Sequence, residues 1–197
     1  MNNKIAFGIG GIVLGLLLAA IFAFMFFPAF RNGGIGMMNS NTHAEGNPQM
    51  MGTINSTFIE QMIPHHESAV AMAKLALEKS KRTEIKTLAT AIIADQTKEI
   101  KDMTGWYKDW FGREVPKGGA QMHMGGQDDM TSLEKATDFD KAFLEEMTAH
   151  HRLALMMVTM LTVENSRPEL LQLAKNITAS QSAQIQQMQT WYSTWYK

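Results

Sequence analysis

The nine residues FIEQMIPHH (58–66) recur 85 positions later as FLEEMTAHH (143–151). Both copies hold a phenylalanine, a glutamate, a methionine and two adjacent histidines at the same spacing. The same offset continues without a gap into a second segment, where a Trp-Tyr-x-x-Trp pattern at 106–110 matches residues 191–195. Rare residue types do not keep one register over such a distance by chance, so the sequence predicts an internal duplication.

Each copy is predicted to contain two helices. In the second segment of the first copy, apolar side chains recur at steps of three and four residues, the period of one helical face. These residues are Leu88, Ile92, Ile100, Met103, Trp106 and Trp110. Breaks near residues 80–83 and 165–168 turn each copy into an antiparallel hairpin, and Asp138 and Ser166 are typical helix caps. The sequence therefore predicts an all-α four-helix bundle made of two hairpins.

The chain divides into five predicted parts. They are an N-terminal membrane anchor or signal segment (1–31), a Gly/Met-rich flexible tether (32–52), hairpin copy one (53–111), a Met/Gly-rich crossover loop (112–137) and hairpin copy two (138–197). The tether and the crossover are assigned as loops because their glycines and methionines show no periodicity.

Residues 5–30 contain no charged side chain. This run exceeds the 7–15 apolar residues of a secretory signal and is long enough to form a transmembrane helix. No small-residue cleavage site follows it, because Phe26, Phe27 and Phe30 crowd its end. We expect an uncleaved anchor that holds the bundle at the extracytoplasmic face of the membrane, in the periplasm or the cell exterior. A cleaved signal peptide and a buried core helix are the alternatives.

The amino-acid composition limits the kinds of binding site and active site that the chain can form. The 18 basic and 19 acidic residues nearly balance, which gives no electrostatic footprint for nucleic acid. There is no cysteine, but there are 17 methionines, so sulfur is present only as thioether. Thiolate sites and a cysteine nucleophile are excluded. Methionine and histidine are the soft-metal ligands that remain, and both suit an oxidising compartment.

On a helix, Met62 precedes His65 and His66 by three and four residues, so these side chains share one side. Copper(I) is a soft ion that favours thioether sulfur and imidazole nitrogen, and helical bundles place metal ligands in their cores. Met103 and Met188, on the partner helices, are expected to add donors. The candidate core ligands are Met62, His65, His66, Met72 and Met103 in copy one and Met147, His150, His151, Met157 and Met188 in copy two.

A second Met–His cluster lies in the crossover. Met122, His123 and Met124 are consecutive, and a flexible tract of this composition can capture copper(I). Low-complexity linker without metal is the alternative interpretation.

The repeated Met-x-x-His-His segments, at 62–66 and 147–151, and the Trp-rich second helices resemble domain of unknown function family 305, a group within the ferritin-like superfamily. The resemblance covers roughly residues 53–197. It implies a ferritin-like four-helix bundle and, for the better-understood members, periplasmic copper binding and resistance. It also implies that the Met and His residues of both segments are the functional ones.

The resulting hypothesis is a non-enzymatic protein that binds copper(I), and also silver, for buffering, delivery or resistance. Its expected partners are the metal ion, the membrane and a copper-handling protein. Binding is expected to weaken below pH of about 6.5, the ordinary pKa of histidine.

Two other hypotheses remain. One is a membrane-anchored helical interaction module without metal, whose methionines contact partner helices. The other is a ferritin-like di-iron oxidase, which is less favoured because such sites need Glu-x-x-His pairs and methionine occupies the glutamate position here.

Overall fold

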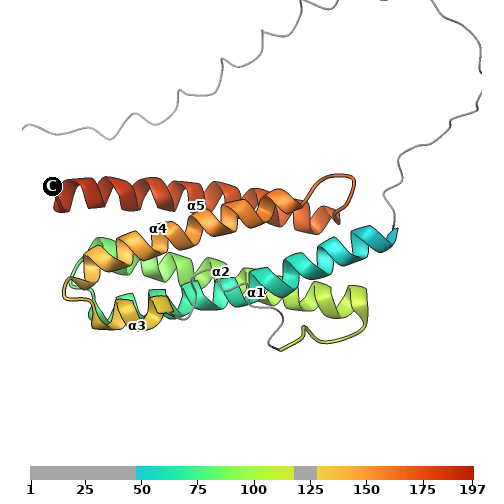
Figure 1. Cartoon of the computed structure of the whole chain (residues 1–197), viewed down its shortest axis with the longest axis horizontal. Coiled ribbons are helices and arrows are strands. Elements are labelled where there is room, and N and C mark those ends of the chain that lie inside the picture. The colour runs from blue at the N-terminus through green and yellow to red at the C-terminus, as the bar shows by residue number, and fades with distance from the viewer. Residues whose placement is uncertain (1–47, 118–127) are drawn as a thin grey trace, which may run out of the picture. The chain divides into compact units, whose positions relative to one another are not determined.

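The computed structural model describes residues 48–117 and 128–197, and every regular element in these ranges is helical (Figure 1). In chain order the elements are α1 (Pro48–Lys79), α2 (Thr83–Phe111), α3 (Asp128–Lys135), α4 (Phe139–Met157), the 3₁₀ turn η1 (Val158–Met160) and α5 (Pro168–Trp195). The all-α prediction is confirmed for these ranges. The predicted anchor at residues 1–31 lies outside them. None of the helices in the described ranges combines the length and hydrophobicity that membrane spanning requires.

The four long helices form the two predicted hairpins. Helix α1 packs along α2, and α4 packs along α5, while the α1–α4 contact joins one hairpin to the other (Figure 1). The first break falls where it was predicted, between Lys79 and Thr83. The second break is longer than predicted, because α4 ends at Met157 and η1 follows before α5 begins at Pro168.

The loops are shorter than the composition suggested. The predicted crossover (112–137) contains the eight-residue helix α3, and α1 begins at Pro48, inside the predicted tether (32–52). Helix α3 is held by Leu133, which is fully buried in the core. A single buried leucine leaves no periodic pattern, so sequence analysis missed this helix.

One of the two predicted caps is correct. The Asp138 side chain accepts a hydrogen bond from the Lys141 backbone N–H at 3.1 Å and caps α4. The Ser166 prediction is wrong, since the N-cap of α5 is Arg167 and no side chain of its own segment caps it. Instead, Asn55 of α1 accepts the Arg167 backbone N–H through Oδ1 at 3.3 Å. The start of α5 is thus fixed by the other hairpin.

The two hairpins also contact each other through a matched pair of cation–π interactions. Arg82 lies over the Trp195 ring at 4.0 Å, and Arg167 lies over the Trp110 ring at 4.5 Å. The two arginines are related by the 85-residue offset, and so are the two tryptophans. Each turn therefore contacts the far end of the other hairpin, as a two-fold related pair would.

Replacing Phe143, which is fully buried in the core, tests the packing. Phe143→Ala leaves a cavity and should lower the free energy of unfolding by about 3–5 kcal/mol, measured by urea denaturation. Lys86→Ala on the exposed side of α2 is the control and should change it by less than about 0.5 kcal/mol. Equal effects from both variants would contradict this packing.

Candidate metal centre

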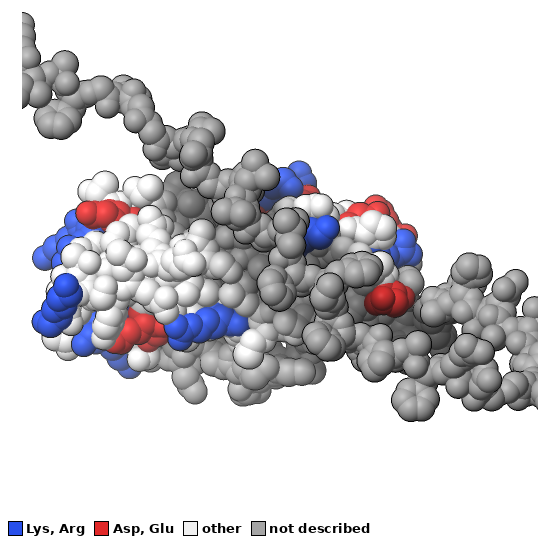
Figure 2. All heavy atoms as spheres, turned by 90° about the horizontal axis from the view of Figure 1, so that it is seen from above, with Lys and Arg blue, Asp and Glu red and all other residues white. Residues whose placement is uncertain are grey.

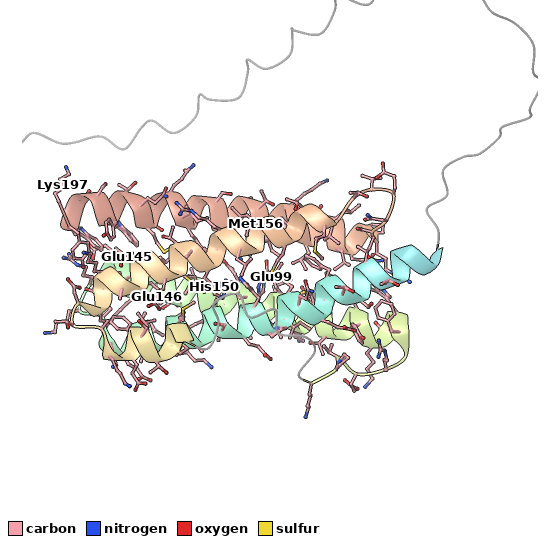
Figure 3. The ribbon with its side chains drawn as sticks, in the orientation of Figure 1. Glu99, Glu145, Glu146, His150, Met156 and Lys197 are labelled. Carbon is pink, nitrogen blue, oxygen red and sulfur yellow. The ribbon has the colours of Figure 1, made fainter. Side chains whose placement is uncertain are left out.

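Four histidines meet in the interior where α1 packs against α4. The rings of His65 and His150 are in contact, with centroids 3.7 Å apart and planes tilted by 36°. Each of these rings lies near the other histidine of its own pair, with centroids 6.2 Å apart for His65–His66 and 6.3 Å for His150–His151. Figure 3 places His150 near the middle of the helices, with Glu99 beside it in this view. The two predicted pairs thus form one group.

The outer histidine of each pair is held by the second helix of its hairpin. His66 Nε2 lies 2.7 Å from Glu99 Oε2, and His151 Nε2 lies 2.6 Å from Gln184 Oε1. Glu99 and Gln184 occupy matched positions of the duplication. A carboxylate or amide oxygen only accepts, so the imidazole Nε2–H donates in both cases. Each ring then keeps a lone pair on Nδ1.

Five buried imidazole nitrogens have no hydrogen-bond partner within the described residues. They are Nδ1 and Nε2 of His65 and the Nδ1 atoms of His66, His150 and His151. Buried polar atoms are almost always satisfied, and leaving one unpaired costs about 1–3 kcal/mol. So many orphan nitrogens in one place indicate a site built for an additional group.

Burial favours the neutral form of His65, His150 and His151. It lowers the pKa of His65 from 6.5 to about 3, assisted by the neighbouring imidazoles of His66 and His151. Burial likewise lowers the pKa of His151 to about 4, against the opposing effect of its hydrogen bond to Gln184. The pKa of His150 is also well below its ordinary value, chiefly through burial and then through the His65 ring. Neutral imidazole is the form that ligates a metal.

Thioethers flank this group in two sets, each of which draws on both copies. Met62 and Met103 are fully buried in one apolar cluster, and Met157 packs against it. Met72, Met147 and Met188 are buried together in the other cluster. Met103 therefore lies in the same apolar cluster as Met62, and Met188 lies in the same cluster as Met147. The prediction that each copy supplies its own set is wrong for Met72 and Met157, which join the cluster of the opposite copy.

The register explains the thioether sets. Helices α1 and α2 are antiparallel, and the His66–Glu99 hydrogen bond fixes their alignment. Four residues back along α1 is Met62, and four residues forward along α2 is Met103. We call Met62, His66 and Met103 the first site. The second site consists of Met147, His151 and Met188, in the same register on α4 and α5.

The remaining predicted ligands fall elsewhere. Met122, His123 and Met124 lie outside the described residues. Met156, next to Met157 on α4, is 59% exposed, and Met160 is also exposed. The core methionines are instead buried, or partly buried in the case of Met157. They do not form the exposed stripe that the interaction-module hypothesis needs.

Sequence analysis missed the polar partners in the core. Glu99 and Gln184 were not singled out; the 85-residue offset matches them with each other, but their contacts to His66 and His151 follow only from the structure. Gln96 and Gln181 are also matched and buried, and the side-chain oxygen of each lacks a hydrogen-bond partner. Such amide oxygens are harder ligands than sulfur or imidazole.

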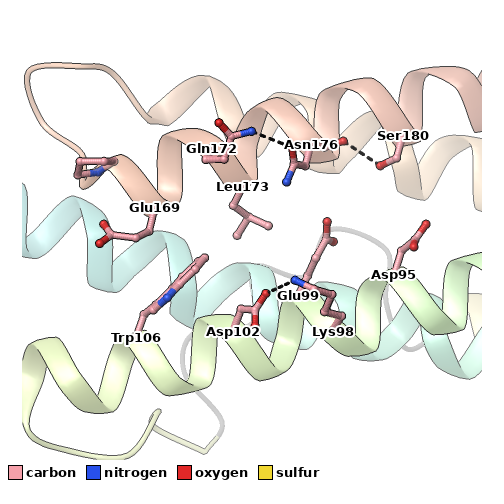
Figure 4. Close-up of a pocket in the computed structure, with 11 residues that line it drawn as sticks. Asp95, Lys98, Glu99, Asp102, Trp106, Glu169, Gln172, Leu173, Asn176 and Ser180 are labelled. Carbon is pink, nitrogen blue, oxygen red and sulfur yellow. Dashed lines mark hydrogen bonds and ion pairs between the residues drawn. The ribbon is translucent and has the colours of Figure 1, made fainter.

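Glu99 also reaches the surface. It lines a cleft of about 700 Å³ between α2 and α5, together with Asp95 and Asp102 on its own helix and Glu169 on α5 (Figure 4). Lys98 pairs with Asp102 at 2.6 Å.

By contrast, α5 has no charged residue from 176 to 195, and Figure 2 shows the uncharged surface over this part of it.

The donors present suit a soft ion. Although the four histidine rings lie close together, no three His, Asp or Glu side chains within residues 48–117 and 128–197 are placed to hold one metal ion among themselves, so a carboxylate-rich site for a hard ion is absent there. The buried set consists of neutral imidazole nitrogens and thioethers, the ligand types that copper(I) and silver favour. The orphan nitrogens fit such an ion.

Known proteins share this architecture. CopM in the Cu(I)-bound form is 43% identical, with a TM-score of 0.67 over 73% of this chain and 98% of that one. CopM has also been solved in Cu(II)-bound and Ag-bound forms. A DUF305 fragment from Deinococcus radiodurans is 25% identical, with a TM-score of 0.62 over 70% of this chain and 93% of that one.

Uncharacterized protein L153 of Acanthamoeba polyphaga mimivirus is 44% identical over 46 residues, which is 23% of this chain and 30% of that protein. The match thus spans less than a third of this relative. The model of a domain of unknown function, DUF305, covers far more of the chain, residues 55–192, and includes both hairpins. The chain belongs to the DUF305 family.

Proposed function

We propose that this protein binds copper(I), and also silver, in the core of its helical bundle, and that it buffers or delivers the metal or provides resistance to it. The observation that carries the proposal is the group of five orphan imidazole nitrogens beside two sets of buried thioethers. The similarity to CopM, which was solved with copper and with silver, supports a copper-handling role.

The proposed role is binding rather than catalysis. Neutral donors in a closed core hold a soft monovalent ion without supplying an acid, a base or a nucleophile to a substrate. A di-iron oxidase would need grouped carboxylates, and the described residues contain no such group.

The proposed location is the extracytoplasmic face of the membrane, with residues 5–30 as the anchor. The uncharged run and the absence of cysteine support it. A copper-handling protein is the proposed partner for metal delivery.

Removing the central donors should abolish tight copper(I) binding. His65→Phe with His150→Phe keeps two packed rings but removes their nitrogens. Losing a group that only supports a metal ligand costs about 10- to 100-fold in affinity, so losing direct ligands should cost more than about 100-fold. Anaerobic titration of the full chain against a chromogenic copper(I) chelator measures this, and circular dichroism checks that the variant is folded. A folded variant with unchanged affinity would contradict the proposal.

The thioethers are tested by a matched pair on α4. Met147→Leu removes a buried sulfur at nearly constant volume, and Met156→Leu removes an exposed one. Only the first should weaken copper(I) binding. Equal affinity for both variants and the wild type would show that the core sulfurs do not ligate the metal.

The pH dependence differs from that of ordinary histidines. The pKa values of His65 and His151, about 3 and 4 in the folded chain, keep these ligands neutral well below 6.5, so copper(I) affinity should persist at pH 5.5. The expected onset of weakening therefore moves from about 6.5, the ordinary pKa of histidine, to a lower pH. Chelator competition between pH 7.5 and 5 checks this, and a steep loss centred on 6.5 would contradict it.

The free energy of unfolding of the metal-free protein should fall as the pH is lowered from 7.5 to 5. The unfolded chain takes up protons near pH 6.5, whereas the folded chain takes them up only near pH 3–4. Stability is therefore full above 6.5 and falls with decreasing pH by about 1.4 kcal/mol per unit for each such histidine. Urea denaturation at several pH values should show this slope, and His65→Phe with His150→Phe should reduce it.

The role of the crossover cluster can be tested independently of the core site. Replacing Met122, His123 and Met124 by serine should lower the copper(I) stoichiometry and leave the tight core binding unchanged. Elemental analysis after desalting measures the ratio, and an unchanged ratio would remove this loop from the proposed function.

A further inference from the structure

The outer histidines of the two sites make matched hydrogen bonds, but the two acceptors differ in charge. His66 donates to a carboxylate oxygen of Glu99, while His151 donates to an amide oxygen of Gln184, at 2.7 and 2.6 Å. Both rings are fully buried, and both keep an unpartnered Nδ1. Duplication preserved the acceptor at this position and changed only its charge.

The charge difference extends along the two helices. Asp95, Glu99 and Asp102 follow one face of α2 at steps of four and three residues. The matched residues on α5 are Ser180, Gln184 and Gln187, which are all neutral. Asp102 is paired with Lys98. Glu99 is the acid of this face that contacts a buried histidine.

We propose that Glu99 is a positioning residue that makes the first site the tighter of the two for a soft monovalent cation. This inference rests on the proposed function and adds an order of binding to it. Glu99 fixes the His66 ring with Nε2–H toward α2 and leaves the Nδ1 lone pair for the metal. Its negative charge also offsets the charge of the bound cation.

Because Glu99 and His66 are largely buried, the negative charge of Glu99 acts strongly on the His66 ring. The Glu99 side chain is 13% exposed and the His66 side chain is fully buried, so solvent screens their interaction weakly. The second site lacks this charge, because Gln184 is neutral and α5 is uncharged from 176 to 195. Glu169 lies across the cleft on α5. We expect two affinities from the two repeats because of this difference in charge.

Reciprocal substitution in the full chain tests the proposal. Wild-type protein should bind copper(I) in two steps during chelator competition. Glu99→Gln should weaken the tighter step by about 10- to 100-fold, bringing the two steps together. Gln184→Glu should strengthen the weaker step by a comparable factor. Exchanging both residues should restore two steps. A Glu99→Gln curve identical to that of the wild type overturns the proposal.

Asp102→Asn is the matched control. It removes the same charge from the same face of α2, three residues away and without contact to a histidine. It should leave both steps within about threefold of the wild type, because an exposed charge acts weakly at that distance. If Asp102→Asn acts as strongly as Glu99→Gln, the effect is the general field of the helix and the positioning role is wrong.

A metal-free measurement separates this proposal from the proposed function. ¹⁵N NMR of the histidine rings should show His66 as the Nε2–H tautomer in the wild type. Glu99→Leu, which removes the acceptor, should shift His66 toward a mixture and leave His151 unchanged. A wild-type His66 in the Nδ1–H form overturns the positioning role. If the tautomers agree but copper(I) does not bind, the proposed function fails and the order of binding fails with it.

Discussion

The close contact between the tilted His65 and His150 rings is the one on which the centre depends. It joins α1 to α4, and these helices form the contact between the hairpins. A positive charge on either ring would be repelled by the other and left without water, so both pKa values fall and the rings stay neutral. The outer histidines and the thioethers are arranged around this neutral pair. The same contact therefore sets the hairpin geometry and the chemistry of the core.

Much of this arrangement could be predicted from the sequence because the duplication repeats both the helical period and the Met–His segment. The all-α class, the first hairpin break and the burial of at least one histidine in each copy follow from these patterns. The exchange of Met72 and Met157 between clusters could not be predicted, because spacing along one helix does not reveal which neighbouring helix it crosses. Helix α3 was missed because one buried leucine is no pattern.

The two halves illustrate how a repeated fold can acquire unequal sites. Backbone register is shared, since it is fixed by the apolar residues and by the hydrogen bond that each outer histidine makes. Charge is free to differ, because glutamate and glutamine have nearly the same shape and both accept from Nε2–H. A change of this kind alters electrostatics and leaves packing intact. Differences between matched positions are therefore the most informative part of a duplicated sequence.

The reciprocal arginine–tryptophan contacts have a consequence for the symmetry of the chain. Arg82 contacts Trp195 as Arg167 contacts Trp110, so the surface of each hairpin is complementary to a copy of itself. This is the property of an isologous interface, in which identical subunits meet across a two-fold axis. A hairpin with these residues carries both halves of such an interface. The duplicated chain thus holds within one polypeptide the kind of contact that a homodimer makes between two.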